Sequence, residues 1–127
     1  MKGSAKEASE YERYFVAIIP PKHIAEQIHL LKVAACERFG SCAALKSPPH
    51  ITLHMPFRWK NKKENELIRF FEQFKFGHTP AEIVLRGIDH FGNRVIYLSV
   101  EKNPTLSNLQ NTLTGDMRKR LGLINAS

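Results

Sequence analysis

The sequence contains little cysteine, with Cys36 and Cys42 as the only two among 127 residues. Two cysteines are too few for a disulfide framework or a four-ligand zinc site, so we expect both thiols to be reduced. No apolar run approaches the roughly 18 residues that a membrane span needs. The polar N-terminus lacks an apolar signal core, which argues against secretion. These absences predict a cytoplasmic protein without a membrane segment.

Length and composition favour one folded domain. A chain of 127 residues with 43% hydrophobic and 24% charged residues can form one core and is not typical of a disordered protein. Residues 1–12 are polar and are expected to form a mobile arm, and residues 13–127 are expected to form a single domain. The formal net charge of +7 favours phosphate-bearing partners without identifying one.

The spacing of apolar residues predicts four strands and three helices. The strands are expected at 14–19, 50–55, 81–89 and 94–101, and the helices at 23–39, 62–74 and 104–121. Pro56 is expected to end the second strand, and Gly92-Asn93 to form the turn of a hairpin. Leu113 and Met117 belong to the apolar stripe of the last helix. The order β-α-β-α-β-β-α indicates an α+β fold, with helices packed on a mainly antiparallel sheet.

The segment His50-Ile51-Thr52-Leu53 contains the side chains that point most clearly to a reaction. Because a strand sends alternate side chains to opposite faces, His50, Thr52 and His54 are expected to share one face. An imidazole and a hydroxyl about 6–7 Å apart along a strand can transfer a proton beside a phosphate. The segment alone also fits a half-buried strand whose polar residues face water.

With these elements in place, the chain resembles the 2'-5' RNA ligase family of the two-histidine phosphoesterase superfamily. Three segments carry the resemblance: Arg13–Ile18 followed by Pro20 resembles the opening strand, His50–Leu53 matches the first His-x-Thr-Leu motif, and Phe91–Val100 is similar to the hairpin strand before the last helix. The resemblance implies a two-lobed fold in which each lobe contributes one His-x-Thr to a central cleft.

The resemblance also implies an activity, either opening of 2',3'-cyclic phosphates or ligation of RNA ends. His50 is then expected to act as the catalytic acid or base, and Thr52 to donate a hydrogen bond to the phosphate. The expected partners are RNA ends or cyclic nucleotides, and no cofactor or metal is needed. His54, Arg58 and Trp59 are candidates for contacting the substrate by stacking or charge, although an exposed loop also explains the last two. Phe15 is expected in the core.

The second His-x-Thr motif of the family is missing from these residues. None of the histidines other than His50 has a threonine two places later, and His78-Thr79 has it one place too soon. Three explanations of the missing motif remain open. The chain is truncated, it is a relative with one catalytic histidine, or two chains complete one site. We therefore expect weak or no activity from the chain as given. The alternatives to an enzyme are a module that binds RNA ends or nucleotides without chemistry, and an inactive remnant.

Overall fold

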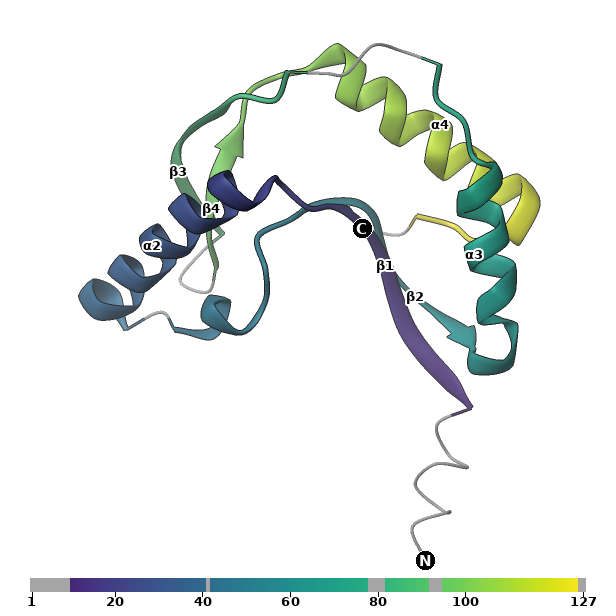
Figure 1. Cartoon of the computed structure of the whole chain (residues 1–127), viewed down its shortest axis with the longest axis horizontal. Helices are drawn as coiled ribbons and strands as arrows, with labels where there is room; N and C mark the ends of the chain where they lie inside the picture. The colour runs from purple at the N-terminus through teal and green to yellow at the C-terminus, as the bar shows by residue number, and fades with distance from the viewer. Residues whose placement is uncertain (1–9, 41, 78–81, 92–94, 126–127) are drawn as a thin grey trace, which may run out of the picture. The chain divides into compact units, whose positions relative to one another are not determined.

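The computed structural model describes residues 10–40, 42–77, 82–91 and 95–125 (Figure 1). These residues divide into two compact units. The first comprises the described residues up to Lys63 together with Asn125 near the C-terminus, and the second runs from Glu64 to Ile124. The elements follow the order β-α-β-α-β-β-α, which confirms the predicted α+β fold. Most of the predicted arm lies outside the described residues, and its last two positions, Tyr11 and Glu12, belong to the first strand.

The first unit is built on a two-stranded antiparallel ribbon. Strand β1 (Tyr11–Ile18) pairs with β2 (Ile51–Lys60) along almost its whole length (Figure 1). The prediction that Pro56 ends the second strand is wrong, since β2 continues through it. The register shifts by one residue next to this proline, between the pairs Tyr14–Phe57 and Val16–His54. A bulge leaves a residue outside the ladder, so the missing N–H of proline is tolerated there.

Helix α2 (Lys22–Phe39) follows β1 and ends where the sequence predicts. Gly40 adopts a left-handed conformation with φ of 73°, and its N–H donates to the carbonyl of Cys36 at 2.9 Å. Glycine adopts this conformation without the steric cost of a Cβ, so it ends the helix. Among the described residues no side chain of α2 is fully buried, and Leu31 is 48% exposed. The apolar stripe of this helix is therefore only partly covered in the part of the chain described.

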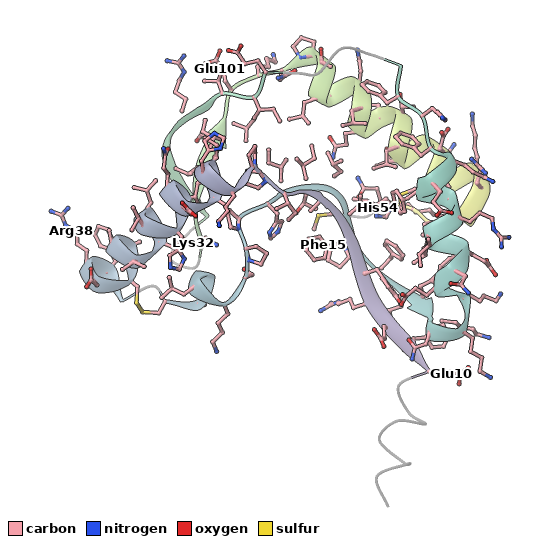
Figure 2. All side chains as sticks on the ribbon, viewed as in Figure 1. Glu10, Phe15, Lys32, Arg38, His54 and Glu101 are labelled. Carbon is pink, nitrogen blue, oxygen red and sulfur yellow. A yellow bond between two sulfur atoms is a disulfide. The ribbon has the colours of Figure 1, made fainter. Side chains whose placement is uncertain are left out.

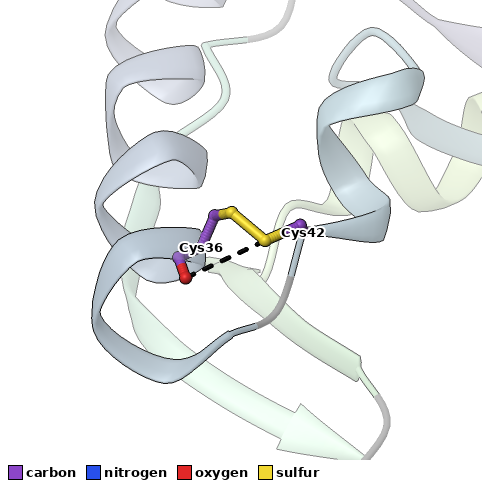
Figure 3. The surroundings of a disulfide bond; sticks show 2 residues. All are labelled: Cys36 and Cys42. Carbon is purple, nitrogen blue, oxygen red and sulfur yellow. Dashed lines mark hydrogen bonds between the residues drawn. A yellow bond between two sulfur atoms is a disulfide. The ribbon is translucent and has the colours of Figure 1, made fainter.

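The two cysteines form a disulfide, so the prediction of two reduced thiols is wrong (Figure 3). Cys36 lies in the last turn of α2, and Cys42 immediately precedes a short 3-10 helix (Ala43–Lys46). The chain reverses at Gly40 and brings the two Cα atoms to 4.5 Å, within the range that a disulfide can bridge. Lys32 also ties this loop to α2, because its Nζ donates to the carbonyl of Ser47 at 2.7 Å.

We expect alkylation without reductant to leave Cys36 and Cys42 unmodified, and alkylation after reduction to add two groups, as read by intact mass. The bridge closes a short loop, since the cysteines are six positions apart. The chain-entropy model then gives a loss of about 2 kcal/mol in the free energy of unfolding on reduction. Urea unfolding with and without reductant measures this loss. Two adducts on the unreduced protein would contradict the pairing.

The second unit contains α3 (Glu64–Gln73), a hairpin of β3 (Leu85–Phe91) and β4 (Val95–Val100), and α4 (Pro104–Leu121). The predicted Gly92-Asn93 turn lies outside the described residues. Leu113 and Met117 of the predicted stripe are buried in α4, and Leu67 and Phe70 are buried in α3. The two helices touch through Arg120, whose Nη2 donates to Oε1 of Gln73 at 2.7 Å. The four described strands thus form two separate antiparallel sheets.

Both ends of α4 have the residues that its boundaries require. The side chain of Asn103 accepts a hydrogen bond from the N–H of Leu106 at 3.0 Å, and Pro104 occupies the first helical turn. Such a cap satisfies an N–H that has no partner inside the helix. At the other end, Gly122 adopts a left-handed conformation with φ of 70°. These local signals explain why the sequence predicts both boundaries of this helix.

Candidate functional site

The β1–β2 ribbon has two faces of different character. Residues paired directly across an antiparallel ladder point to the same face, and alternate residues of one strand share a face. Tyr11 pairs with Lys60, Arg13 with Arg58, and Ala17 with Thr52. We call this side the open face, because most of its side chains are exposed. It comprises Tyr11, Arg13, Phe15, Ala17, Thr52, Arg58 and Lys60, together with His50.

His50 immediately precedes β2 and is exposed. Its ring lies 5.1 Å from the ring of Phe15, measured between centroids. Because Phe15 shares its strand face with Ala17, and Ala17 pairs with Thr52, this contact places His50 and Thr52 on the same side of the ribbon. The structure therefore brings together the imidazole and the hydroxyl of the His-x-Thr segment.

The imidazole of His50 is held by the chain that leads into the strand. Its Nδ1 lies 3.0 Å from the carbonyl oxygen of Pro48. A carbonyl oxygen can only accept, so Nδ1 carries the proton in this hydrogen bond and Nε2 of the neutral ring carries the lone pair. Such a ring is oriented with its basic nitrogen available to another molecule. The two prolines before His50 restrict the backbone that supplies this carbonyl.

The prediction that His54 shares a face with His50 and Thr52 is wrong. The register shifts between the pairs Val16–His54 and Ala17–Thr52, which leaves one extra residue, Leu53, in β2. A bulge of this kind breaks the alternation of side chains. His54 therefore pairs with Val16 on the other face, and Figure 2 shows it projecting to a different side of the ribbon from Phe15. The reason for proposing His54 as a substrate contact is lost.

His54 is instead part of the buried side of the ribbon, with only 1% of its surface exposed. Its Nδ1 lies 2.8 Å from the carbonyl oxygen of Met55, and its ring packs edge-on against Phe57 at 5.3 Å. Among the described residues, its Nε2 has no hydrogen-bond partner. Tyr14 and Trp59 also contact the ring of Phe57, at 6.1 and 6.4 Å. This aromatic face thus contains the ring contacts around Phe57, whereas most side chains of the open face are exposed.

Arg58 and Trp59, which the sequence groups as one substrate contact, point to opposite faces. Both lie within β2, so the alternative of an exposed loop is wrong for them. Trp59 pairs with Glu12, and its indole Nε1 donates to the carbonyl of Lys63 at 2.8 Å. It thus fastens the end of the strand to the following 3-10 helix (Asn61–Lys63). Arg58 belongs to the open face, where its guanidinium lies 5.1 Å from the ring centroid of Tyr11.

Sequence reasoning missed the aromatic residues of the open face. The sequence predicts Phe15 in the core, yet it is 47% exposed and contacts His50. The sequence predicts Tyr11 in the arm, yet it is a strand residue that is 40% exposed, and Nζ of Lys60 lies 5.9 Å from its ring centroid. The signal was present, because Tyr11, Arg13 and Phe15 alternate with residues of the aromatic face. An apolar run at the start of a domain favours a buried strand. That expectation outweighs the signal that its side chains alternate between two faces.

The part of the chain that the structure describes offers neither a cluster of metal ligands nor a membrane-spanning helix. It contains no group of three or more histidine, cysteine, aspartate or glutamate side chains placed to hold a metal ion. No described helix combines the length and the apolar character that crossing a bilayer requires. The described site thus consists of one exposed histidine, one threonine, and the cations and aromatic rings beside them.

Comparison with known proteins gives the family. A protein of Geobacillus sp. (strain WCH70), named as a candidate phosphoesterase, is 29% identical over 103 residues, which are 80% of this chain and 57% of the relative. The chain thus spans a little over half the length of that relative. No solved structure matches the chain. The model of the 2'-5' RNA ligase superfamily matches residues 20–122, which include His50 and Thr52 but not β1. The chain therefore belongs to the 2'-5' RNA ligase superfamily.

Proposed function

We propose that His50 and Thr52 form one half of a phosphate site that opens 2',3'-cyclic phosphates on RNA ends or nucleotides, with ligation of such ends as the related reaction. The observation that carries the proposal is the orientation of His50, whose Nδ1–H is held by the Pro48 carbonyl at 3.0 Å while the ring stays exposed. Membership of the 2'-5' RNA ligase superfamily and similarity to a candidate phosphoesterase support phosphoester chemistry.

The proposed chemistry needs one base and one acid. Nε2 of His50 takes a proton from water, the water oxygen forms a bond to phosphorus, and the bond from phosphorus to one ribose oxygen breaks. An acid gives its proton to that leaving oxygen, and the product is a phosphate monoester. Thr52 donates its hydroxyl hydrogen to a phosphate oxygen, where negative charge increases in the transition state. In the ligation reaction, a 5'-hydroxyl replaces water as the attacking group.

The acid is expected to be a second histidine, and 2'-5' RNA ligases place it in a second His-x-Thr. His50 is the only histidine among these 127 residues with a threonine two places later. We therefore expect the 127-residue chain to hydrolyse cyclic phosphates weakly or not at all. Activity is measured on the full-length gene product, meaning the protein translated from the whole coding sequence. Robust hydrolysis by the monomeric 127-residue chain would contradict a two-histidine mechanism.

Thr52→Val in the full-length gene product tests the phosphate contact. Valine keeps the shape of the strand residue and removes the hydroxyl, so we expect turnover of a 2',3'-cyclic nucleotide to fall about tenfold to a hundredfold. Thr52→Ser keeps the hydroxyl and is the matched control, for which we expect a much smaller loss. Initial rates at saturating substrate measure both variants. Equal losses in the two variants would show that the hydroxyl does not act.

A second candidate function is binding without chemistry, favoured by the single His-x-Thr and by the exposed cations of the open face. Titration of labelled RNA, with and without a terminal phosphate and at two salt concentrations, separates the possibilities. The proposed site predicts tighter binding of the phosphorylated end at both salt concentrations. Binding that ignores the terminus and weakens steeply with salt would indicate nonspecific electrostatic attraction alone.

A further inference from the structure

The far end of the open face, away from His50, carries more positive charge than the ribbon needs for its own stability. Arg13 and Arg58 are directly paired across the ladder, and like charges in this position destabilise a sheet. Lys60 lies next to them, opposite Tyr11. Among the described residues no carboxylate forms an ion pair with any of the three cations. An anionic partner would therefore relieve a repulsion that the free ribbon contains.

Two aromatic rings alternate with these cations. Tyr11 is 40% exposed and Phe15 is 47% exposed, both on the open face. They are four residues apart in one strand, which separates them by roughly 13 Å. The guanidinium of Arg58 lies 5.1 Å and Nζ of Lys60 lies 5.9 Å from the ring centroid of Tyr11. Phe15 lies beside His50, so the rings mark the two ends of a path from the imidazole along the ribbon.

Exposed aromatic rings between cations are the arrangement that binds single-stranded nucleic acid, because rings stack on bases while cations contact phosphates. Bases inside a duplex are not available for such stacking, and RNA-binding proteins read unpaired ends and loops for this reason. A single nucleotide held at His50 would leave the far ring and its cations unused. An acidic protein surface would satisfy the charges, but it would give the rings no planar partner.

We propose that the open face binds single-stranded RNA along its length, so that the partner is an oligonucleotide with its terminal phosphate at His50. The inference rests on the proposed function for that terminal contact. Phe15 supports the terminal nucleotide, and Tyr11, Arg13, Arg58 and Lys60 hold nucleotides further along the strand. The protein then selects RNA ends over mononucleotides through contacts made several residues away from the reacting phosphate.

The test is fluorescence anisotropy on the 127-residue chain with labelled RNAs of two and eight nucleotides, each ending in a 3'-phosphate. The eight-nucleotide RNA should bind more tightly than the dinucleotide and more tightly than its own duplex. Tyr11→Ala should weaken the longer RNA about fivefold to 150-fold, the range of one lost stacking contact, and leave dinucleotide binding within about twofold. Tyr11→Phe keeps the ring and should retain the affinity.

Arg58→Ala provides a second, independent readout. It should weaken binding of the eight-nucleotide RNA and reduce the salt slope by about 0.7, the contribution of one phosphate contact to a single strand. The matched control is Arg69→Ala, which removes the same charge from an exposed position of α3 and should leave the slope unchanged. Because Arg58→Ala removes a like-charge pair, its stability to urea should not fall.

Equal affinity for the two RNA lengths would overturn the proposal, as would equal effects of Arg58→Ala and Arg69→Ala. Tighter binding of polyglutamate than of RNA would overturn it as well, by identifying an acidic protein surface as the partner. The proposed function fails separately, if His50→Ala leaves hydrolysis of a dinucleotide cyclic phosphate by the full-length gene product unchanged. If His50→Ala loses that hydrolysis but RNA binding does not depend on RNA length, the extended path along the open face is wrong and the proposed function stands.

Discussion

His50→Ala in the full-length gene product is expected to lower hydrolysis of 2',3'-cyclic phosphates by about 10²–10⁴-fold, the usual contribution of a positioned general acid or base. The imidazole is exposed, and its Nδ1 is bonded to the Pro48 carbonyl at 3.0 Å, so its removal takes away the group that moves the proton. Initial rates with a cyclic mononucleotide and with a short RNA ending in a cyclic phosphate measure the loss.

His29→Ala is the matched control, because His29 is an exposed histidine of α2. This variant should keep the activity of the unmodified protein. Because His50 is exposed, His50→Ala should also keep the midpoint of thermal unfolding. Unchanged turnover in His50→Ala would remove it from the mechanism. A loss of turnover that accompanies a lower unfolding midpoint would indicate damage to the ribbon instead.

Met117→Ala is expected to lower the free energy of unfolding by about 2–5 kcal/mol, as truncation of a buried methionine typically does. Met117 has 0% of its surface exposed and lies one turn from Leu113, which is 2% exposed. The substitution removes apolar contacts and leaves a cavity that the surrounding side chains fill only in part. Urea unfolding followed by circular dichroism measures the change.

Met55→Ala is the control for this loss, since Met55 is 38% exposed and surface substitutions commonly change stability by only about 0.5 kcal/mol. Met117→Leu nearly conserves the volume and should cost less than about 1.5 kcal/mol, which keeps the test informative if the alanine variant does not fold. Similar losses at Met55 and Met117 would show that α4 does not contribute a core position at 117.

The elements that the sequence predicts best are those whose signals are local. Gly40 and Gly122 end helices where the chain needs a left-handed residue, and Asn103 with Pro104 starts the last helix. The spacing of Leu113 and Met117 identifies the buried side of α4 because helical periodicity needs no knowledge of the partner. These signals explain why the α+β order could be predicted.

The features that could not be predicted depend on how two segments pair. The bulge at Leu53 is a property of the β1–β2 register, and nothing within the segment itself shows that it moves His54 to the other face. The disulfide depends on the reversal at Gly40, which two cysteines in the sequence do not reveal. Phe15 is likewise exposed because it lies on the open face, which is defined only once β1 is paired with β2. His50 and Thr52 keep their predicted shared face because both precede the bulge.

The most direct test of the central claim is an NMR titration of the 127-residue chain with a nucleoside 3'-monophosphate, followed through the ring signals of its histidines and phenylalanines. Binding at the proposed site should shift the ring signals of His50 and Phe15 together and leave those of His29 and the buried His54 unchanged. Shifts centred on His54, or on residues away from the open face, would contradict the assignment of this face as the phosphate site.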